Sequence, residues 1–475
     1  MNECISIFDM LKIGVGPSSS HTLGPWRGAE RLLNELREEG LFGKVNRIKI
    51  DLYGSLSLTG KGHATDLAIM LGLSGADPEY IPVEDIDGII ENINTNNQLK
   101  LGNEKSISFT PKTDIIFNKE FLPFHSNGFS FTAYTDNSEY VSTFYSIGGG
   151  FVTKEDNSAD EKEKGDLKCN FPFPIDKADD LLQYVRSENK KISEIVYANE
   201  KSIRSEEEIH NELMRVWNTM LECMHIGCHT EGVLPGGLNV RRRAYDMHQK
   251  LIGDLPYNSP QEWLQVIRKT EVKFRQILKW VSCFALSVNE VNAALGRVVT
   301  APTNGSAGVI PSVLMYYMVI ENHNANEEHI KQFLLVAGEI GSIFKKGATI
   351  SAAMGGCQAE IGVSSAMAAG ALCEVMGGTP EQCLVASEIA MEHHLGLTCD
   401  PVAGLVQVPC IERNTMGAIK AINAAELALE TDPKNVKVPL DKVVNTMWET
   451  AKDMDNKYKE TSEGGLAVAV NLPNC

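Results

Sequence analysis

The pattern of apolar and polar residues divides the chain into two unlike parts. In residues 1–152, apolar side chains alternate with polar ones over 48–52 and again over 129–133, which is typical of half-buried strands. Two helices are expected. The first covers about 23–39 and stops at a glycine, and the second covers about 64–71. The pattern predicts an α+β domain in which a sheet carries helices on one face.

The second part, residues 191–475, has a helical pattern. Ser205 and Glu208 have the spacing of a capping box, and the apolar residues between 209 and 224 recur every three or four positions. Further helices are expected near 260–295, 310–321, 328–345, 358–376, 380–394 and 415–430. Glycine, alanine and serine are frequent between 347 and 370 and would let helices approach closely. We therefore expect an all-α domain built as a tight bundle.

The segment between the two parts is polar. Residues 153–166, TKEDNSADEKEKGD, are rich in acids and lysines and contain no large apolar side chain, so they cannot bury enough surface to order themselves. We expect an acidic linker or insertion over 153–190. The preceding SIGGGFV at 146–152 is interpreted as a strand that ends in a glycine turn, in preference to a phosphate loop.

Composition and charge limit the possible partners. The net charge of −18 argues against nucleic acid and anionic membranes, because both would repel the protein. The N-terminus lacks the basic region of a secretory signal, and the longest apolar stretch, 309–320, is too short to cross a bilayer. Eleven cysteines among 475 residues are too dilute for a disulfide scaffold. These features predict a cytoplasmic protein whose thiols stay reduced.

Five cysteines lie between Gly355 and Asn414, and three of them differ from the rest. Cys357 follows two glycines, Cys399 precedes Asp-Pro and Cys410 follows a proline, so each lies beside residues that break regular structure. The other two, at 373 and 383, lie inside helical runs, where a cysteine usually acts as a small buried apolar residue. The spacing of the three matches neither a zinc ribbon nor a ferredoxin motif. Taken alone, the spacing is more typical of three unrelated core or loop cysteines.

Four longer motifs give these cysteines a context. GVGPSSSHTLGPWR at 14–27, APTNGSAGVIPSVL at 301–314, GGCQAEIGVSSAMAAGAL at 355–372 and EHHLGLTCDPVAGLVQVPCIERN at 392–414 together closely resemble the iron-sulfur L-serine dehydratases (L-serine ammonia-lyases) of bacteria. The resemblance covers nearly the whole chain. It implies a lyase that converts L-serine to pyruvate and ammonia, a 4Fe-4S cluster and a homodimer. It also implies that the N-terminal domain is similar to the allosteric substrate-binding domain of a phosphoglycerate dehydrogenase.

Dehydration of serine needs a base for the Cα proton and an electrophile for the hydroxyl group. Three cysteine ligands would leave one iron of a four-iron cluster open to act as that electrophile. The resemblance assigns Cys357, Cys399 and Cys410 as the three ligands.

The candidate base is one of two histidines, His63 in GKGHATD and His21 in SSSHT. From the residues alone, each is as typical of a helix cap or a surface position. The resemblance favours His63 as the base and gives His21 an orienting role. His393 and His394, close to Cys399 in sequence, could tune the cluster or merely end a helix.

Two polar loops are candidate binding sites for the substrate. Ser18, Ser19 and Ser20 precede an expected helix N-terminus, where free N–H groups favour a carboxylate. The second loop consists of compact donors before another helix, namely Thr303, Asn304, Gly305 and Ser306. An ordinary N-cap is the alternative interpretation of each loop.

Cys475 ends the given sequence and is a candidate fourth ligand. Its thiol stands where serine has its hydroxyl, so we expect it to reach the open iron when serine is absent. A chance cysteine in an untethered tail is the alternative.

Two other functions remain possible from the sequence. A pyridoxal-phosphate dehydratase would need a Schiff-base lysine and a glycine-rich phosphate loop, and the nearest approach is Lys345 and Lys346 beside Gly347. A non-catalytic amino-acid sensor with a structural metal would use the N-terminal domain but leave the cysteine-bearing half without a purpose.

Overall fold

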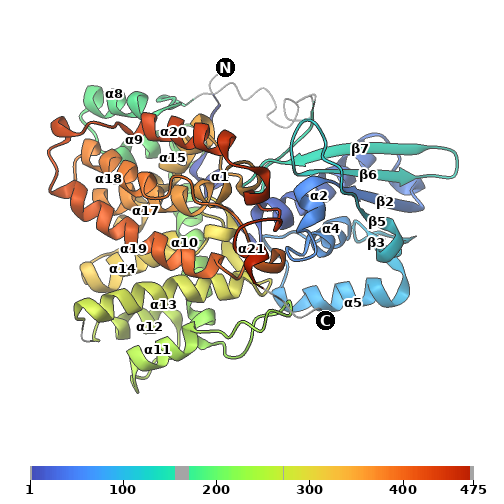
Figure 1. Cartoon of the computed structure of the whole chain (residues 1–475), viewed down its shortest axis with the longest axis horizontal. Coiled ribbons are helices and arrows are strands. Elements are labelled where there is room, and N and C mark those ends of the chain that lie inside the picture. The colour runs from blue at the N-terminus through green and yellow to red at the C-terminus, as the bar shows by residue number, and fades with distance from the viewer. Residues whose placement is uncertain (1–2, 156–170, 271, 471–475) are drawn as a thin grey trace.

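The computed structural model describes residues 3–155, 171–270 and 272–470. Figure 1 shows two regions side by side, an α/β region built from the N-terminal part and a larger region that is mostly helical. This arrangement confirms the predicted fold class.

A mixed seven-stranded sheet forms the α/β region. Its strand order is β3 (Gln98–Leu101), β4 (Lys105–Ser108), β2 (Arg47–Leu52), β6 (Gly128–Tyr134), β7 (Glu139–Ser146) and β8 (Val152–Thr153), and β5 (Ile115–Phe117) also pairs with β2. The central strand β2 is antiparallel to β6, with Ile48 opposite Ala133, and parallel to β4 and β5. Both strands that alternation predicted are therefore neighbours at the centre of the sheet.

Helices cover one face of this sheet. The helices α2 (Gly24–Glu38) and α4 (Thr65–Leu73) pack against each other, and α5 (Ile86–Asn96) adjoins α4. Leucines of α2 and phenylalanines of β6 belong to one buried cluster. The close approach requires a glycine, because a Cβ at Gly28 would lie 2.4 Å from the Phe129 ring. The glycine turn at 148–150, where all three residues have positive φ, leads into β8 and agrees with the interpretation as a strand end.

The first residues of the chain pack into the helical region. The short helix α1 (Ile7–Met10) contacts α15 (Glu327–Gly347), and β1 (Ile13–Val15) pairs antiparallel with β9 (Arg297–Val299). The N-terminal segment therefore connects the two regions before α2 begins.

The helical region is organised around α17 (Ile361–Val375), which contacts α15, α18 (Pro380–Glu392) and α19 (Cys410–Leu429). Its residues from Ile361 to Glu374 are all buried, as the small-residue composition predicts. The other helices of this region are α8 (Ala178–Glu188), α9 (Ile192–Lys201), α10 (Glu206–His229), α11 (Ala244–Ile252), α12 (Pro260–Ile267), α13 (Phe274–Asn292), α14 (Val309–Tyr316), α16 (Ala352–Gly355), α20 (Leu440–Asp453) and α21 (Leu466–Ala469).

The structure differs from the expected elements in three places. Part of the segment expected as a linker, Ala178–Glu188, forms α8, because Leu181 and Val185 pack into the helical core. The helix expected over 260–295 is two helices, and α19 begins at Cys410 instead of near 415.

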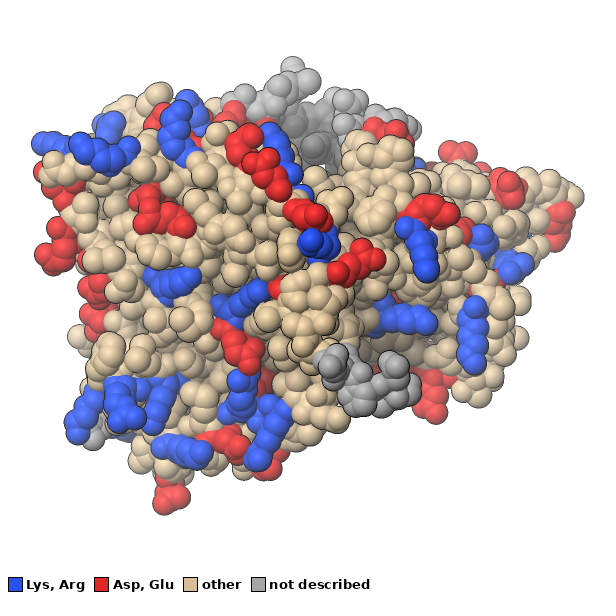
Figure 2. All heavy atoms as spheres, in the orientation of Figure 1, with Lys and Arg blue, Asp and Glu red and all other residues tan. Residues whose placement is uncertain are grey.

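Three further observations bear on the environment of the chain. Cys4 is disulfide-bonded, in contrast to the expectation of reduced thiols throughout. None of the helices within the described ranges is long and apolar enough to cross a membrane. On the face shown in Figure 2, acidic and basic side chains are interspersed over both regions.

Candidate active site

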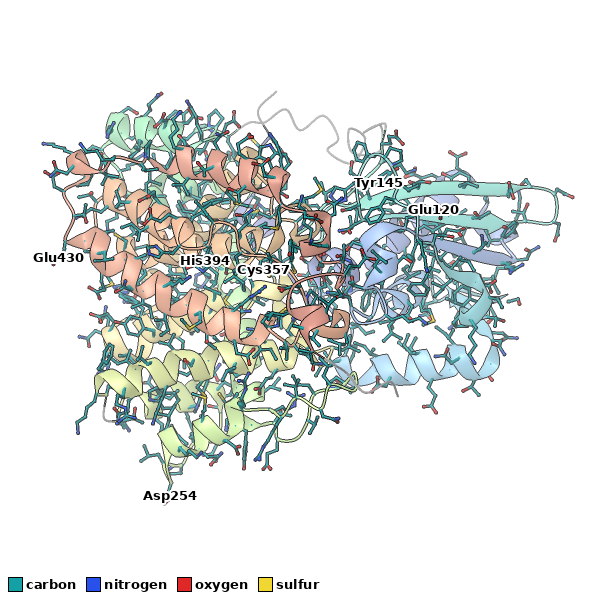
Figure 3. All side chains as sticks on the ribbon, in the orientation of Figure 1. Glu120, Tyr145, Asp254, Cys357, His394 and Glu430 are labelled. Carbon is teal, nitrogen blue, oxygen red and sulfur yellow. The ribbon has the colours of Figure 1, made fainter. Side chains whose placement is uncertain are left out.

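Three buried cysteines gather where helices of the helical region begin. Cys357 lies in the turn Gly356–Ala359 before α17, Cys399 lies in an irregular segment, and Cys410 is the first residue of α19. They are only 2, 3 and 7% exposed. Figure 3 shows Cys357 inside the helical region, on the side that faces the α/β region.

Ligand atoms of two of these cysteines and a glutamate converge. The sulfurs of Cys357 and Cys399 and a carboxylate oxygen of Glu360 lie within 4.8 Å of one another. Cys410 lies beside them: burial raises the pKa of its thiol well above the usual value, and the charge of Cys357 adds to this shift. The sequence brings Glu360 here because it follows Cys357 by three residues in the turn that starts α17.

Arg413 binds this group of thiols from one side. Its Nη1 lies 3.2 Å from the sulfur of Cys357, and its Nη2 lies 2.9 Å from Oδ1 of Asp400. Burial would lower the pKa of Arg413, but the charges of Cys357, Cys410 and Cys399 raise it above its usual value. The guanidinium thus contacts the sulfur of Cys357 and lies close enough to the other two cysteines for their charges to act on it.

The residues fit a metal cluster. Without a metal, a hydrogen bond to Cys357 and burial raise the pKa of Cys399, and burial raises the pKa of Cys410, so these two thiols favour the protonated form. A bound metal cation reverses that preference, because coordinated thiols are deprotonated. Soft thiolate ligands select iron-sulfur clusters and zinc over magnesium or calcium, and Arg413 would balance part of the resulting negative charge.

Two buried histidines lie on the other side of the site. His21 lies in the π-helical turn Ser19–Leu23, and His63 lies in the turn before α4. Their ring centroids are 4.6 Å apart. Both rings face one carboxylate oxygen of Glu460, at 3.5 Å from Nδ1 of His21 and 3.5 Å from Nε2 of His63.

The hydrogen bonds fix the tautomer of His21. Ser55 donates its hydroxyl proton to the carbonyl of Glu460 at 2.7 Å, so the 3.0 Å contact between Ser55 Oγ and Nε2 of His21 must be donated by the histidine. Nδ1 then accepts the hydroxyl of Ser20 at 2.9 Å. Burial lowers the pKa of His21 well below its usual value. His21 is therefore neutral, and both of its ring nitrogens are engaged.

His63 is held differently. Its Nδ1 lies 2.9 Å from the carbonyl of Thr59, which can only accept, so Nδ1 carries the proton. Burial lowers the pKa of His63 to about 4. The ring is therefore neutral, and Nε2 carries a lone pair. The carboxyl of Glu460, 3.5 Å from Nε2, is farther than a normal hydrogen bond. His63 is thus the histidine that can accept a proton.

Glu460 joins the histidines to the cysteines. Its backbone N–H donates to the carbonyl of Cys399 at 2.8 Å, while its side chain faces both histidines. Burial raises the pKa of Glu460 well above its usual value, and the charges of Glu360 and Cys357 add to the shift. This shift favours the protonated carboxyl. The residue adopts a backbone conformation with φ of 58°.

The first candidate substrate loop lies against these groups. Ser18 caps the turn by accepting the N–H of His21 at 3.1 Å, so in this respect it is an ordinary N-cap. Ser20 contacts His21 and also lies 3.5 Å from Glu460. Ser19 is buried in the same turn.

The second candidate substrate loop contacts the cysteine group. A Cβ at Gly305 would lie 2.9 Å from the carboxylate of Glu360, so the loop packs closely against this side chain. Thr303 hydrogen-bonds Glu360 as well, and Ser306 lies 3.1 Å from Thr303. The side-chain oxygen of Asn304 is buried without a hydrogen-bond partner among the described residues. This oxygen points to a ligand that completes the site.

The pairing of β1 with β9 brings the two loops together. Asn304 donates to the carbonyl of Val15 at 3.3 Å, and Asn292 donates to the carbonyl of Pro17 at 2.8 Å. Gly16 permits this contact, because a Cβ there would lie 2.2 Å from the carbonyl oxygen of Asn292. Residues far apart in the sequence are thereby fixed around one site.

Other candidates from the sequence lie elsewhere. Cys373 and Cys383 are fully buried and hydrogen-bond each other, as expected of core cysteines. His393 and His394 each place Nδ1 on the carbonyl four residues earlier at the end of α18, which is a helix-end role. Cys475 lies outside the described residues.

The lysines that a pyridoxal enzyme would need are also outside the site. Lys345 pairs with Glu3 at 2.8 Å, and Lys346 donates to the carbonyl of Ile175 at 2.6 Å. Within the described residues, neither lysine forms a hydrogen bond or ion pair with His21, His63 or the three site cysteines.

Sequence reasoning missed four residues of the site: Glu360, Arg413, Ser55 and Glu460. Glu360 and Arg413 each follow a ligand cysteine by three residues, inside motifs that had already been singled out. That spacing on a helical turn could have identified them. Glu460 lies in the polar segment KETSEGG, which offers no such signal.

Comparison with known proteins accounts for this combination of motifs. The family described as serine dehydratase alpha chain matches residues 187–467, and the family described as serine dehydratase beta chain matches residues 6–157. The chain belongs to the serine dehydratase family. Both family regions are thus present in one polypeptide.

Several relatives of known function cover the full length. An L-serine dehydratase of Streptomyces coelicolor is 46% identical over 99% of this chain and 100% of its own length. An L-serine dehydratase of Haemophilus influenzae and L-serine dehydratase 1 of Escherichia coli are each 45% identical over 98% of this chain and 99% of their own length. The family assignment therefore covers the whole chain.

Proposed function

We propose that this protein is an L-serine dehydratase, a lyase that removes water from L-serine. The initial product, 2-aminoacrylate, hydrolyses to pyruvate and ammonia. Family membership and the full-length relatives support the activity. The observation that carries it is the junction through Glu460, which joins a neutral histidine pair to a group of buried thiols.

The proposed cofactor is a 4Fe-4S cluster held by Cys357, Cys399 and Cys410. The convergence of two of these sulfurs within 4.8 Å and the contact of Arg413 with the sulfur of Cys357 support this assignment. When bound, the cluster would supply a Lewis-acidic iron that helps the serine hydroxyl to leave. We propose Cys475 as a fourth ligand when substrate is absent.

His63 is the proposed base for the Cα proton. Its Nε2 carries a lone pair because Nδ1 donates to Thr59, and its lowered pKa keeps it neutral at physiological pH. His21 has both ring nitrogens engaged by Ser55 and Ser20, so its role is to orient its neighbours. The two roles follow from the hydrogen bonds of each ring.

The two polar loops are the proposed substrate cradle. Ser18, Ser19 and Ser20 offer hydroxyls and N–H groups to a carboxylate. Thr303, Asn304, Gly305 and Ser306 line the other side, and the unpartnered oxygen of Asn304 would accept from the substrate ammonium. Binding of the substrate between the loops would satisfy that buried oxygen.

The experiment that tests this function is a pyruvate assay on anaerobically purified enzyme with L-serine. His63→Ala should lower turnover by about 100- to 10,000-fold, the usual contribution of a general base. The exposed His393 provides the matched control, and His393→Ala should remain within about twofold of wild type.

Three outcomes would reject the proposal. No pyruvate from the wild type would reject the activity, and near-normal Cα proton release in His63→Ala would reject the assignment of the base. Equal losses in both variants would reject the distinction between them.

We also propose a homodimer in the cytoplasm, as the family resemblance implies. Light scattering on purified enzyme tests the assembly, and cell fractionation tests the location. A monomer at micromolar concentration would contradict the first.

A further inference from the structure

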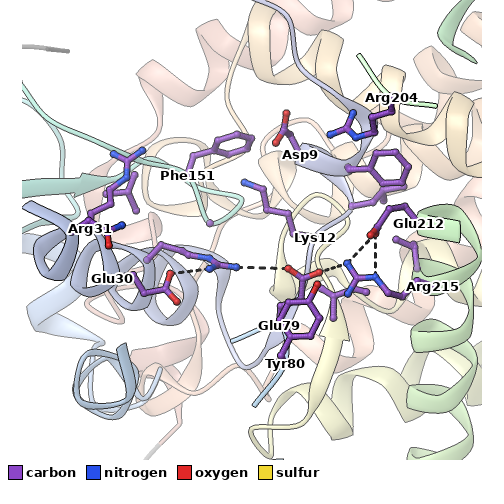
Figure 4. Close-up of a pocket in the computed structure, with 18 residues that line it drawn as sticks. Asp9, Lys12, Glu30, Arg31, Glu79, Tyr80, Phe151, Arg204, Glu212 and Arg215 are labelled. Atoms are coloured by element: carbon purple, nitrogen blue, oxygen red, sulfur yellow. Dashed lines mark hydrogen bonds and ion pairs between the residues drawn. The ribbon is translucent and has the colours of Figure 1, made fainter. Parts of the chain in front are cut away.

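A second cavity lies apart from the proposed active site. It has a volume of about 680 Å³, within the usual range for small-molecule sites. Its walls come from the N-terminal segment, α2, the loop at 79–80, the loop at 150–152 and α10, as Figure 4 shows. No residue of the histidine or cysteine groups lines it.

Lys12 is the unusual residue of this cavity. Its Nζ lies 3.3 Å from the carbonyl of Gly149 and 3.4 Å from the centroid of the Phe151 ring. The two contacts of Nζ are thus a carbonyl oxygen and an aromatic ring. Among the described residues, no carboxylate lies within ion-pair distance of Nζ. The ammonium of Lys12 therefore lacks a counterion of its own.

The surroundings of Lys12 disfavour the charged form of its amine. Burial lowers the pKa of Lys12 to about 8; the charge of Asp9 opposes the shift, and the charges of Lys345, Arg27 and Arg31 add to it. Basic side chains thus gather around Lys12, although the protein as a whole carries a net charge of −18.

Of the four acids that line the cavity, Asp9 accepts the N–H of Ser6 at 3.1 Å, and the other three are engaged by arginines. Glu30 accepts from Arg27 at 2.8 Å, and Glu212 and Glu79 both accept from Arg215. Figure 4 shows these pairs on the wall opposite Phe151. They cannot serve as counterions for Lys12 without losing their present partners.

Arg27 has donor capacity left for a ligand. Its Nη1 is bonded to Glu30, whereas its Nη2 reaches Asp77 and Glu79 only at 3.8 and 3.9 Å. Both distances are longer than a hydrogen bond. Lys12 and Arg27 together present two cations to the same cavity.

We propose that this cavity binds a small anion through carboxylate or phosphate oxygens, with Lys12 and Arg27 as its main contacts. The anion would supply the counterion that Lys12 lacks. Charge-assisted hydrogen bonds to carboxylate or phosphate are about twice as strong as neutral ones.

The site is coupled to the active site through β1 and β9. Lys12 directly precedes β1, its N–H donates to Thr300 Oγ1 at 3.0 Å, and its carbonyl accepts the N–H of Thr300 at 2.7 Å. The two substrate loops follow β1 and β9 in the chain. An anion that orders Lys12 therefore orders the strand pair from which both loops extend, and lowers the KM for L-serine. This consequence rests on the proposed function, whereas the binding does not.

The test is thermal unfolding of the anaerobic holoenzyme at constant ionic strength. Sodium phosphate, sodium acetate and sodium chloride are compared on wild type, Lys12→Gln and Lys250→Gln. Lys250 is an exposed lysine of α11 and serves as the matched control. Wild type and Lys250→Gln should gain stability with phosphate or acetate over chloride, and Lys12→Gln should not.

The affinity of each variant for the anion gives a second, quantitative test. Loss of a hydrogen bond to a charged group corresponds to about a tenfold or larger rise in the dissociation constant, so titration calorimetry with the better anion should show that rise for Lys12→Gln. A stronger response to phosphate would identify a phosphate ligand, and a stronger response to acetate a carboxylate. Lys12→Arg should retain binding and so guards against a folding defect in Lys12→Gln.

Several outcomes would overturn the inference. Equal stabilisation by chloride, or equal affinity in Lys12→Gln and wild type, would show that no anion site exists at Lys12. Binding with an unchanged KM for L-serine would overturn the coupling. A wild type that binds the anion but makes no pyruvate would reject the proposed function and leave the anion site standing.

Discussion

Glu460 is a single residue that contacts both the cysteine group and the two histidines of the site. Its main chain is bonded to Cys399 and to Ser55, and its carboxyl faces His21 and His63. Its raised pKa favours the protonated carboxyl, which can lie between two neutral histidines without a counterion. We infer that Glu460 is a positioning residue that also exchanges a proton with His63.

Replacement of this carboxyl by an amide separates the two roles. Glu460→Gln keeps the size and the main-chain bonds, so iron content and KM should stay close to wild type. An amide cannot exchange a proton with His63, so kcat should fall by roughly tenfold or more. Steady-state kinetics with L-serine measures both constants.

The control for this change is Glu463→Gln, an exposed residue of the same segment, which should leave both constants unchanged. If Glu460→Gln kept a normal kcat and pH profile, the carboxyl would have only a structural role.

At the scale of single residues, local sequence reveals some site members and hides others. Cys357 and Cys410 adjoin glycine or proline, and Glu360 and Arg413 follow them at helical spacing. Glu460 was missed because its position depends on the main-chain bond to Cys399. A contact of that kind forms only when distant segments fold together.

At the scale of elements, helix α15 contains a buried carboxyl whose effect on the stability of the fold depends on pH. Glu339 is 3% exposed, and its Oε1 has no hydrogen-bond partner within the described ranges. Burial raises its pKa to about 7; Lys346 opposes the shift, and Glu200 adds to it. The folded protein thus holds the proton more tightly than the unfolded chain does, and the stability from this group falls as pH rises from about 4.5 through 7.

Glu339→Gln should therefore stabilise the protein in a pH-dependent way. The amide is neutral at every pH, so the gain in free energy of unfolding should be on the order of 1–3 kcal/mol at pH 8 and much smaller at pH 5. The midpoint of thermal unfolding at the two pH values measures it.

The matched control is Glu327→Gln, at the exposed start of the same helix, which should show no such gain. A loss of stability at pH 8 in Glu339→Gln would mean that the native carboxylate is charged and paired.

Helix boundaries were predictable where periodicity and caps agree. The capping box at Ser205 begins α10 as expected. The start of α19 was missed because Pro409 suggested a break, although a proline at the N-cap leaves the helix free to begin at Cys410. The break between α12 and α13 has no glycine or proline to announce it.

At the scale of the whole molecule, the site belongs to neither region alone. His21 and His63 come from the N-terminal part, and the three cysteines come from the helical part. The antiparallel pairing of β1 with β9 links the parts. Such long-range pairing is not encoded in local patterns, which is why the sequence predicted the two parts but not how they share a site.

The central claim is that Cys357, Cys399 and Cys410 hold the cluster that the reaction requires. The most direct measurement is the iron content of enzyme purified and reconstituted without oxygen, for wild type and single Cys→Ser variants. Wild type and the Cys373→Ser and Cys383→Ser controls should retain iron, because those two cysteines are core residues. Cys357→Ser, Cys399→Ser and Cys410→Ser should each lose it. Full iron retention in any of these three variants, or equal loss in all five, would contradict the account.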